Sequence, residues 1–332
     1  MKKILSITLL MLAFCSITMK AGNEVHFIVR DGLANEALKQ KIQNNVSELL
    51  TGINLTVARG EHALDLKGYT MTNNAKNGLT RLWNHDNFRC PDERVVEEVL
   101  HTRQGYQVRG IPLVKIDENA EENYQEAVIN FDKKGTIISF FYTINPELYT
   151  KAMINETKNL GRENEISDIN RRMQIIDYVE HYRTAYNQKD INFIDQVFSE
   201  DALIITGTVI KARKTEVMVN DKFIKYTKQT KREYIANLRR AFAANKYINV
   251  KFSDIVIVHH PAKKDVYGVT VKQNWNSERY SDEGYLFMVW DFSNEDHPQI
   301  HVRTWQPEYI DKTTGRKLPE NEVFSLKDFN IE

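Results

Sequence analysis

Hydrophobic positions in the first part of the chain follow the period of a helix and then the alternation of strands. Apolar residues recur every three or four positions from residue 35 to residue 57, which predicts an amphipathic helix. They are Leu38, Ile42, Val46, Leu49 and Ile53. Gly60 follows and is a typical helix terminator. Leu79, Leu82 and Trp83 mark a second, shorter apolar turn.

Strand-like segments come next. Residues 94–100 (RVVEEVL) fit a helix or a strand, and the glutamates favour a helix. Three runs rich in β-branched and aromatic residues follow, at 106–116, 124–131 and 136–144. The Asp-Lys-Lys-Gly sequence at 132–135 predicts a hairpin turn between the last two. Helices followed by an antiparallel meander indicate an α+β fold.

The second part repeats this order. Apolar and aromatic residues recur with a helical period at Ile175, Val179, Tyr182 and Tyr186. A short helix at 191–198 and a strand at 202–210 are expected next, and Thr230 with Glu233 forms a capping box that opens another helix. Four strand-like runs complete the segment, and we expect one antiparallel sheet from them. They are residues 250–259, 266–275, 284–292 and 300–305.

These patterns divide the chain into two domains. We expect an N-terminal α+β domain at 22–148, a polar linker and helix entrance at 149–170, a second domain at 171–312 and a tail at 313–332. Residues 82–88 and 197–203 each place an apolar pair and an Asp after a helix and before the sheet. This short correspondence suggests one fold used twice, as a hypothesis.

The first 21 residues have the pattern of a signal peptide. Lys2 and Lys3 precede an apolar run from Ile4 to Ile17, and Ala21 is a small residue at the exit. We expect cleavage after Ala21 and export to the periplasm, the outer membrane or the medium, with an uncleaved anchor helix as the alternative. Lipidation at Cys15 is not expected, because Phe14 is a large residue before it. No other long apolar stretch predicts a transmembrane span.

Composition narrows the function classes. The chain has 45 Lys+Arg and 45 Asp+Glu residues, so its charge balance does not favour a nucleic-acid partner. Without the signal peptide, Cys90 is the single cysteine, and a buried small hydrophobic residue is the more common role for it. There is no His-Glu-x-x-His, paired-cysteine or glycine-rich phosphate motif. We therefore expect no metal and no cofactor.

A family resemblance lies in the second half. Residues 176–203 (IDYVEHYRTAYNQKDINFIDQVFSEDAL) resemble the opening of the nuclear transport factor 2-like superfamily, which includes ketosteroid isomerases and polyketide cyclases. Residues 284–292 and 300–307 are similar to the final hairpin of secreted members from gut-type Gram-negative bacteria. The resemblance implies a cone-shaped, cystatin-like roll: a long helix packed on a bent antiparallel sheet around a pocket. This superfamily contains enzymes, carriers and association modules.

Candidate catalytic residues come from the last strands. Alternation predicts His301, Arg303 and Trp305 on one face of a strand, with Asp291 on the partner strand. An Asp291–His301 pair would be a workable acid and base. The alternative is an ordinary solvent-facing strand. The resemblance implies an active-site acid at Asp201, for which a turn aspartate is the alternative.

Candidate ligand-binding residues are aromatic and basic. Tyr178, Tyr182 and Tyr186 recur every four residues on one helix face, where they line a pocket or belong to the core. Arg303 and Trp305 complete this set. A basic run from Lys222 to Arg232 is expected to be a solvated loop or a lid before the next helix.

No complete catalytic set follows from these residues, so binding is the leading function. The expected partner is a small apolar or mixed ligand in the cone, or a cell-envelope protein on the sheet. An isomerase, dehydratase or cyclase is the first alternative, with Asp201 or the Asp291–His301 pair as base and Arg303 or a tyrosine stabilising an oxyanion. A structural homodimer joined through sheet faces is the second.

Overall fold

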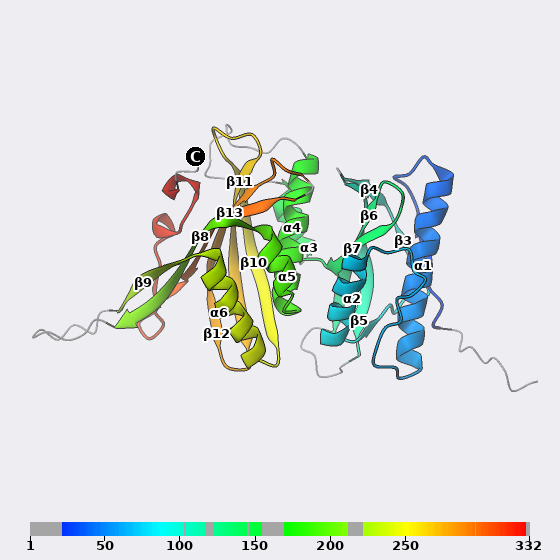
Figure 1. The fold of residues 1–332 in the computed structure, drawn as a ribbon, viewed down its shortest axis with the longest axis horizontal. Coiled ribbons are helices and arrows are strands. Elements are labelled where there is room, and N and C mark those ends of the chain that lie inside the picture. The colour runs from blue at the N-terminus through cyan, green and yellow to red at the C-terminus, as the bar shows by residue number, and fades with distance from the viewer. Residues whose placement is uncertain are drawn as a thin grey trace, which may run out of the picture. The chain divides into compact units, whose positions relative to one another are not determined.

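The computed structural model describes residues 22–102, 104–116, 123–144, 146–154, 169–211, 222–295 and 297–329. The predicted signal peptide and Cys15 lie outside these described residues. The chain divides into two compact units, drawn in Figure 1. Unit 1 runs to Leu100 and includes Gly105–Phe140, and unit 2 contains His101–Gln104 and everything from Phe141 onward.

Unit 1 contains two α-helices and a small β-sheet. Helix α1 spans Glu36–Ala58, and the Asn35 side chain caps it by accepting a hydrogen bond from the Leu38 amide. Helix α2 spans Asn73–His85. The sheet has the order β2-β5-β6-β7, with β4 also paired to β5. The strands are β2 Phe88–Arg89, β4 Val99–His101, β5 Gly105–Lys115, β6 Tyr124–Asp132 and β7 Ile137–Tyr142.

The turn between β6 and β7 is the predicted hairpin. The Asp132 carboxylate accepts hydrogen bonds from the amides of Lys134 and Thr136, each at 2.8 Å. Gly135 has a φ of 76°, a left-handed conformation that glycine adopts without strain. The turn therefore forms from local residues alone, which is why the sequence predicted it.

The prediction of a helix at residues 94–100 is wrong. Arg94–Glu97 forms strand β3, which pairs in parallel with β1 (His26–Val29). Within it Val95 is 4 % exposed and Val96 is 39 % exposed, the alternation of a strand. β-Branched valines pack well on a pleated surface, and the distant partner β1 decides the structure against the glutamates.

Unit 2 is a helix-covered, six-stranded sheet of order β10-β11-β12-β13-β8-β9. Neighbouring strands are antiparallel except β13 and β8, which are parallel. The elements are α3 Pro146–Ile154, α4 Ile169–Asn187, α5 Ile191–Val197, β8 Phe198–Lys211, β9 Lys222–Gln229, α6 Lys231–Ala244, β10 Ile248–His259, β11 Val266–Ser277, β12 Ser281–Asp291 and β13 Gln299–Pro307. This is the predicted α+β roll, with α6 between its first hairpin and its four-stranded meander.

Two segments of unit 2 differ from the prediction. Residues 146–154 form α3 within unit 2, so the second unit begins before the linker expected at 149–170. Residues 155–168 of that linker lie outside the described residues. The basic run from Lys222 forms the edge strand β9 and not a loop. Exposed lysines such as Lys225 and Lys228 suit an edge strand, because they oppose pairing with another chain.

The core of unit 2 lies between its helices and the inner face of the sheet. Tyr182 of α4, Phe198 at the start of β8 and Trp290 of β12 are all at most 1 % exposed. Thr230 and Glu233 form the predicted capping box at the start of α6. The hydrophobic residues that face this core are those on alternate positions of each strand, as period-two alternation requires.

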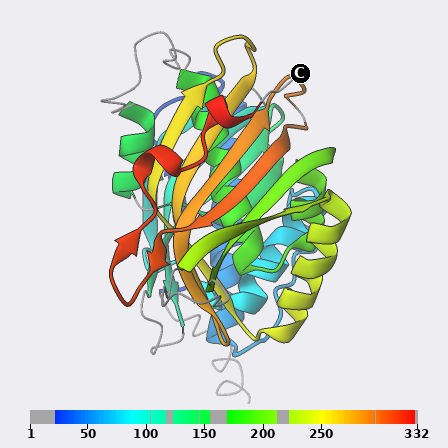
Figure 2. The same ribbon diagram turned by 90° about the vertical axis from the view of Figure 1, so that its left-hand side faces the viewer.

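The C-terminal segment covers part of the outer face of the same sheet (Figure 2). It contains strands β14 Tyr309–Asp311 and β15 Arg316–Lys317 and the short 3₁₀ helices η2 Glu320–Glu322 and η3 Leu326–Asp328. Phe324, Leu326 and Phe329 pack against an apolar cluster of β11, β12 and β13. Of the tail expected at 313–332, the described residues to 329 therefore belong to unit 2, and they lie over a sheet face of the kind that the homodimer alternative would use.

The two units share one local arrangement. In unit 1, α2 ends before β2, with Trp83 and Phe88 buried. In unit 2, α5 ends at the start of β8, with Val197 and Phe198 buried. Between these strands and the meander, unit 2 adds β9 and α6, for which the described residues of unit 1 hold no equivalent.

Candidate functional site

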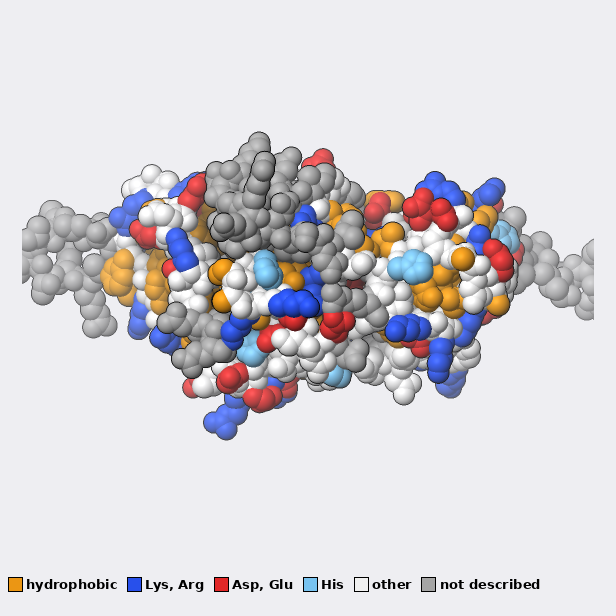
Figure 3. Space-filling model, turned by 90° about the horizontal axis from the view of Figure 1, so that it is seen from above, with side chains coloured by type: hydrophobic (Ala, Val, Ile, Leu, Met, Phe, Trp, Pro, Cys, Tyr) orange, Lys and Arg blue, Asp and Glu red, His pale blue; other side chains and the backbone are white. Residues whose placement is uncertain are grey.

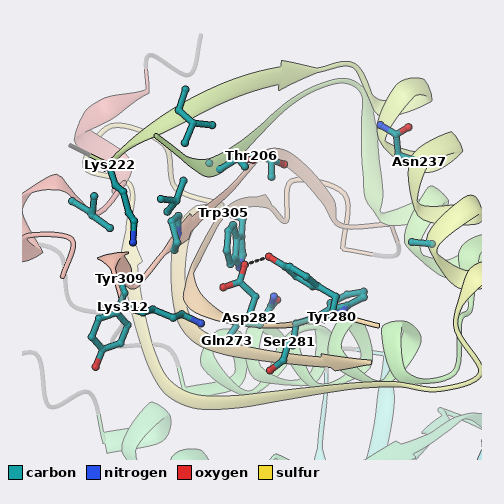
Figure 4. A pocket seen from close by; sticks show the side chains of 18 of the residues that line it. Thr206, Lys222, Asn237, Gln273, Tyr280, Ser281, Asp282, Trp305, Tyr309 and Lys312 are labelled. Atoms are coloured by element: carbon teal, nitrogen blue, oxygen red, sulfur yellow. Dashed lines mark hydrogen bonds between the residues drawn. The ribbon is translucent and has the colours of Figure 1, made fainter. Parts of the chain in front are cut away.

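Unit 2 contains an open cavity of about 720 Å³ (Figure 4). Its walls come from β8, α6, β11, β12 and β13, and from the segment after β13. Trp275, Trp305, Leu238 and Ala241 supply apolar surface. The Trp275 ring packs edge-on against Tyr186, with 5.9 Å between centroids. Trp275 and Trp305 thus form walls of the cavity.

Arg303 of β13 is the charged group at the buried side of this cavity. Its side chain lines the cavity, although the residue is only 7 % exposed. The guanidinium carbon lies 5.0 Å from the centre of the Tyr234 ring, in a cation–π arrangement. The guanidinium also interacts with the Tyr182 hydroxyl. Nε is buried and has no hydrogen-bond partner within the described residues.

Three tyrosine hydroxyls form a chain beside Arg303. The hydroxyl oxygens of Tyr182 and Tyr186 lie 2.9 Å apart, and those of Tyr186 and Tyr234 lie 2.5 Å apart. Burial raises the pKa of Tyr182 and of Tyr186 above the ordinary tyrosine value. Both groups therefore stay protonated at neutral pH and act as hydrogen-bond donors and acceptors, not as bases.

Further polar groups converge on the cavity from other strands. Gln273 of β11 is 6 % exposed and lines the cavity. Figure 4 shows Asn237 on α6 across the cavity from Lys222, which lies near Tyr309 and Lys312. Lys222 is ion-paired with Asp311. An apolar body with a few placed polar groups is the usual composition of a small-molecule site.

Asp282 is the carboxylate that lines the cavity, within the described residues. It accepts a hydrogen bond from the Tyr280 hydroxyl, drawn in Figure 4. Burial raises the pKa of Asp282 above the usual aspartate range, and the hydrogen bond from Tyr280 only partly opposes this shift. A carboxyl that is hard to ionise is thus held in the wall of the cavity.

Asp282 should make unit 2 less stable as the pH rises. The folded state keeps the Asp282 proton to a higher pH than the unfolded chain, whose aspartate pKa is about 3.9. The contribution of this proton to the free energy of unfolding of unit 2 is fully present below about pH 4. It is lost as the pH rises through the raised pKa of Asp282. Replacing Asp282 with Asn should therefore stabilise unit 2 relative to the unchanged chain, by less than about 1 kcal/mol, increasingly from pH 4 to pH 7.

Urea midpoints at several pH values measure this difference. Asp201→Asn is the matched control, because the hydrogen bond from Ser199 lowers the pKa of that exposed carboxyl. This control should show no gain as pH rises. Parallel pH curves for the unchanged chain and Asp282→Asn would contradict the prediction.

The predicted ligand-binding residues divide into two groups. Arg303 and Trp305 line the cavity, and Tyr182 and Tyr186 lie behind them in the tyrosine chain. Tyr178 does not line it, although it lies on the same helix. Its ring packs against Trp290 and Phe292, with centroid distances of 5.6 and 5.8 Å. One helix turn thus separates a core tyrosine from those beside the cavity.

The predicted catalytic residues come together outside the cavity. His301 Nε2 lies 3.5 Å from an Asp291 carboxylate oxygen, and its Nδ1 lies 3.9 Å from Asp201. None of the three lines the cavity. The Asp201 side chain is 84 % exposed, so this group lacks the enclosed surroundings that acid–base catalysis ordinarily uses.

A β-bulge explains why His301 leaves the face of Arg303. On the neighbouring strand β12, Trp290 pairs with Ile300 and Val289 pairs with Val302, so His301 is the extra residue on β13 between two registers. The expectation that His301, Arg303 and Trp305 share one face is therefore wrong for His301. A bulge has no clear local signal here, because its register depends on the neighbouring strands.

Several cavity residues were not predicted as site residues. Tyr234 was expected only as an inward residue of its helix, and Gln273 and Trp275 only as part of a strand. Their alternate positions on β11 place both on the inner face. Tyr280 and Asp282 precede the apolar part of β12, and no local pattern distinguishes them from an ordinary strand entry.

Charge on the molecule is mixed. On the face drawn in Figure 3, acidic and basic side chains are interspersed and neither sign gathers into a large patch. No group of His, Cys, Asp and Glu residues suited to hold a metal ion occurs within the described residues. Among those same residues, no helix combines the length and apolar character needed to cross a bilayer.

We compared the chain with protein-family models, curated proteins and solved structures, and only the solved structures gave matches. No protein-family model and no curated protein matches this sequence. Solved structures do match. One is Bd1075 from Bdellovibrio bacteriovorus, at 19 % identity and a TM-score of 0.32, over 43 % of this chain and 43 % of that chain.

Two further matches are described as NTF2-like proteins. One, of unknown function, is from Pseudomonas putida KT2440, at 12 % identity and a TM-score of 0.32, over 45 % of this chain and 93 % of that one. The other is a dehydratase assigned by family, from Streptomyces avermitilis, at 12 % identity and a TM-score of 0.30, over 41 % and 94 %. At these TM-scores the matches carry no argument about this chain.

Proposed function

We propose that unit 2 is a binding module that holds a small molecule with an apolar body and a polar head. The observation that carries this proposal is the cavity of about 720 Å³ with tryptophan walls and a buried guanidinium. Ligand sites commonly have volumes of roughly 300–1,000 Å³ and combine apolar walls with a few polar groups. Trp275 and Trp305 would contact the body of the ligand, and Arg303 its head.

Binding suits the chemistry of these groups better than proton transfer. The Arg303 guanidinium does not release its proton in proteins. The buried hydroxyls of Tyr182 and Tyr186 have raised pKa values and keep theirs. These side chains can orient and hold a ligand at neutral pH, but none of them has the pKa near 7 that a general base needs.

A neutral apolar dye tests the proposal. N-phenyl-1-naphthylamine should bind the full chain with increased fluorescence, because the tryptophan walls take up its rings. Ala241→Trp fills the cavity from α6 and should weaken dye binding at least about tenfold. Ala243→Trp is the matched control, because Ala243 is exposed near the same end of that helix. Absence of dye binding, or equal weakening by both variants, would reject the cavity as the binding site.

An enzyme of the isomerase or dehydratase kind is the second candidate, favoured by one observation. Asp282 lines the cavity, has a raised pKa and is bonded to the Tyr280 hydroxyl. A carboxyl whose pKa is raised by burial, hydrogen-bonded to a phenol, is a workable acid–base pair. Asp282→Asn should then abolish turnover of a substrate while dye binding stays unchanged.

We also propose that the protein is exported. The support is the sequence of residues 1–21, with two lysines, an apolar run and Ala21 at its exit. The chain recovered from the cell envelope or medium should then begin at Gly22. Recovery of the chain with Met1 intact from the cytoplasm would overturn this proposal.

A further inference from the structure

We infer that the ligand of unit 2 carries a carboxylate and that Arg303 binds this group inside the cavity. The inference rests on the proposed binding function and names the chemistry of the ligand's head. It starts from the charge of Arg303. An arginine side chain stays protonated at all physiological pH values, and this one is 7 % exposed.

Arg303 has no carboxylate partner among the described residues. Its neighbours are the ring of Tyr234 and the hydroxyl of Tyr182, and burial raises the pKa of that hydroxyl so that it stays protonated. Its Nε makes no hydrogen bond there. A buried charge is costly unless it is paired and hydrogen-bonded. The cation–π contact and one hydroxyl offset only part of that cost, and an anion in the cavity would complete the pairing.

Two other buried cations of unit 2 are paired with carboxylates. Arg171 is 2 % exposed and contacts Asp265 at 2.8 Å and Glu295 at 3.4 Å. Lys231 is 9 % exposed and contacts Glu200 at 2.6 Å. The fold therefore satisfies these two cations with its own carboxylates. Arg303 differs by facing a space that a ligand can enter.

The charge of the lining favours an anion as well. Lys211, Lys222 and Lys312 line the cavity along with Arg303, and Asp282 is the carboxylate that faces them within the described residues. Lys222 is already paired with Asp311. Asp282 ionises less readily than an ordinary aspartate. The remaining positive charge would attract an anionic ligand toward the cavity.

The number of available donors points to a carboxylate. A guanidinium presents parallel N–H groups that match the two oxygens of a carboxylate. The hydroxyls of Tyr186 and Tyr234 are already bonded to each other. The tyrosine chain therefore has fewer hydroxyl donors left for the additional oxygens of a phosphate or sulfonate. The apolar walls formed by Trp275 and Trp305 suit an aromatic or aliphatic body attached to the carboxylate.

Paired probes of equal shape test the inference. 2-Naphthylacetate and 2-naphthylacetamide differ in charge, and their affinities for the full chain follow from displacement of N-phenyl-1-naphthylamine. The carboxylate should bind at least tenfold more tightly than the amide, and this preference should shrink as salt is added. Equal affinities for the two probes, or failure of the carboxylate to displace the dye, would overturn the inference.

Arg303→Met removes the charge and keeps an unbranched apolar side chain. Carboxylate affinity should fall at least thirtyfold while amide and dye affinities change less than threefold. Retention of the tenfold preference in this variant would overturn the role of Arg303. If the variant fails to fold, shown by circular dichroism, the comparison of acid with amide on the unchanged chain still decides the inference.

Two outcomes separate this inference from the proposed function. Dye binding without a preference for the acid keeps the cavity as a binding site and rejects the anionic head. No dye binding rejects the proposed function. 2-Naphthyl phosphate is the third probe, and tighter binding of it than of the acetate would replace the carboxylate by a phosphate and so overturn the inference as stated.

Discussion

Replacing Trp290 with alanine is expected to lower the free energy of unfolding of unit 2 by about 3–5 kcal/mol. Trp290 is completely buried on the inner face of β12. Its ring packs against Tyr178 at 5.6 Å, Phe292 at 5.9 Å and Tyr182 at 6.5 Å between centroids. Alanine would leave a large void among these rings, because packed aromatic neighbours can only partly collapse into it.

Urea unfolding followed by circular dichroism measures this loss. Trp290→Phe is the matched control and should cost clearly less than alanine, because an aromatic ring is kept. The indole N–H has no hydrogen-bond partner within the described residues, so phenylalanine removes an unsatisfied donor. Alanine and phenylalanine variants with the same midpoint would show that Trp290 does not hold this core together.

Removing residues 319–332 is expected to make the protein self-associate and to destabilise unit 2 by roughly 3–5 kcal/mol. The deletion takes away Phe324, Leu326 and Phe329. It exposes the apolar cluster of β11, β12 and β13 beneath them, made of Val266, Phe287, Val289 and Val302. Contiguous exposed apolar surface drives association. Gln306 would also lose its hydrogen bonds to Glu322 and Phe324.

Sedimentation velocity at several concentrations distinguishes the two chains. Gly268→Val is a milder variant within the full chain, because a Cβ at Gly268 would lie 2.6 Å from Leu326 Cγ and push the segment outward. Lys327→Ala is the control, since it leaves the three apolar side chains in place. A truncated chain with unchanged stability and sedimentation would mean that the C-terminal segment does not protect the sheet.

Local signals predicted a large part of unit 2. The helical period from Ile175 to Tyr186, the capping box at Thr230 and the four late strands all correspond to observed elements. Each depends on residues close together in the chain, such as the Thr230 hydroxyl that caps the amide of Glu233. Cys90 is buried, as its expected role requires, and burial raises its pKa to about 11.

Local sequence signals did not predict the structure where pairing with another strand determines it. Residues 94–97 form a strand because β1 pairs with them, and Lys222–Gln229 form a strand because β8 does. His301 leaves the face of Arg303 because the register of β13 with β12 shifts by one residue. The partner of residues 94–97 lies far away in the chain, and the other two structures depend on pairing along whole strands.

The sequence by itself determined the α+β class, the helices α4, α5 and α6 with their inward residues, and the four late strands of unit 2. Hydrophobic period, caps and turns are properties of neighbouring residues, and they act before any long-range contact forms. Only the tertiary structure decided that Arg303 meets Tyr182 and Tyr234 in a cavity while His301 meets Asp291 outside it. Those side-chain contacts depend on strand register and on a single bulge. A shift of one residue moves a side chain to the opposite face of a sheet.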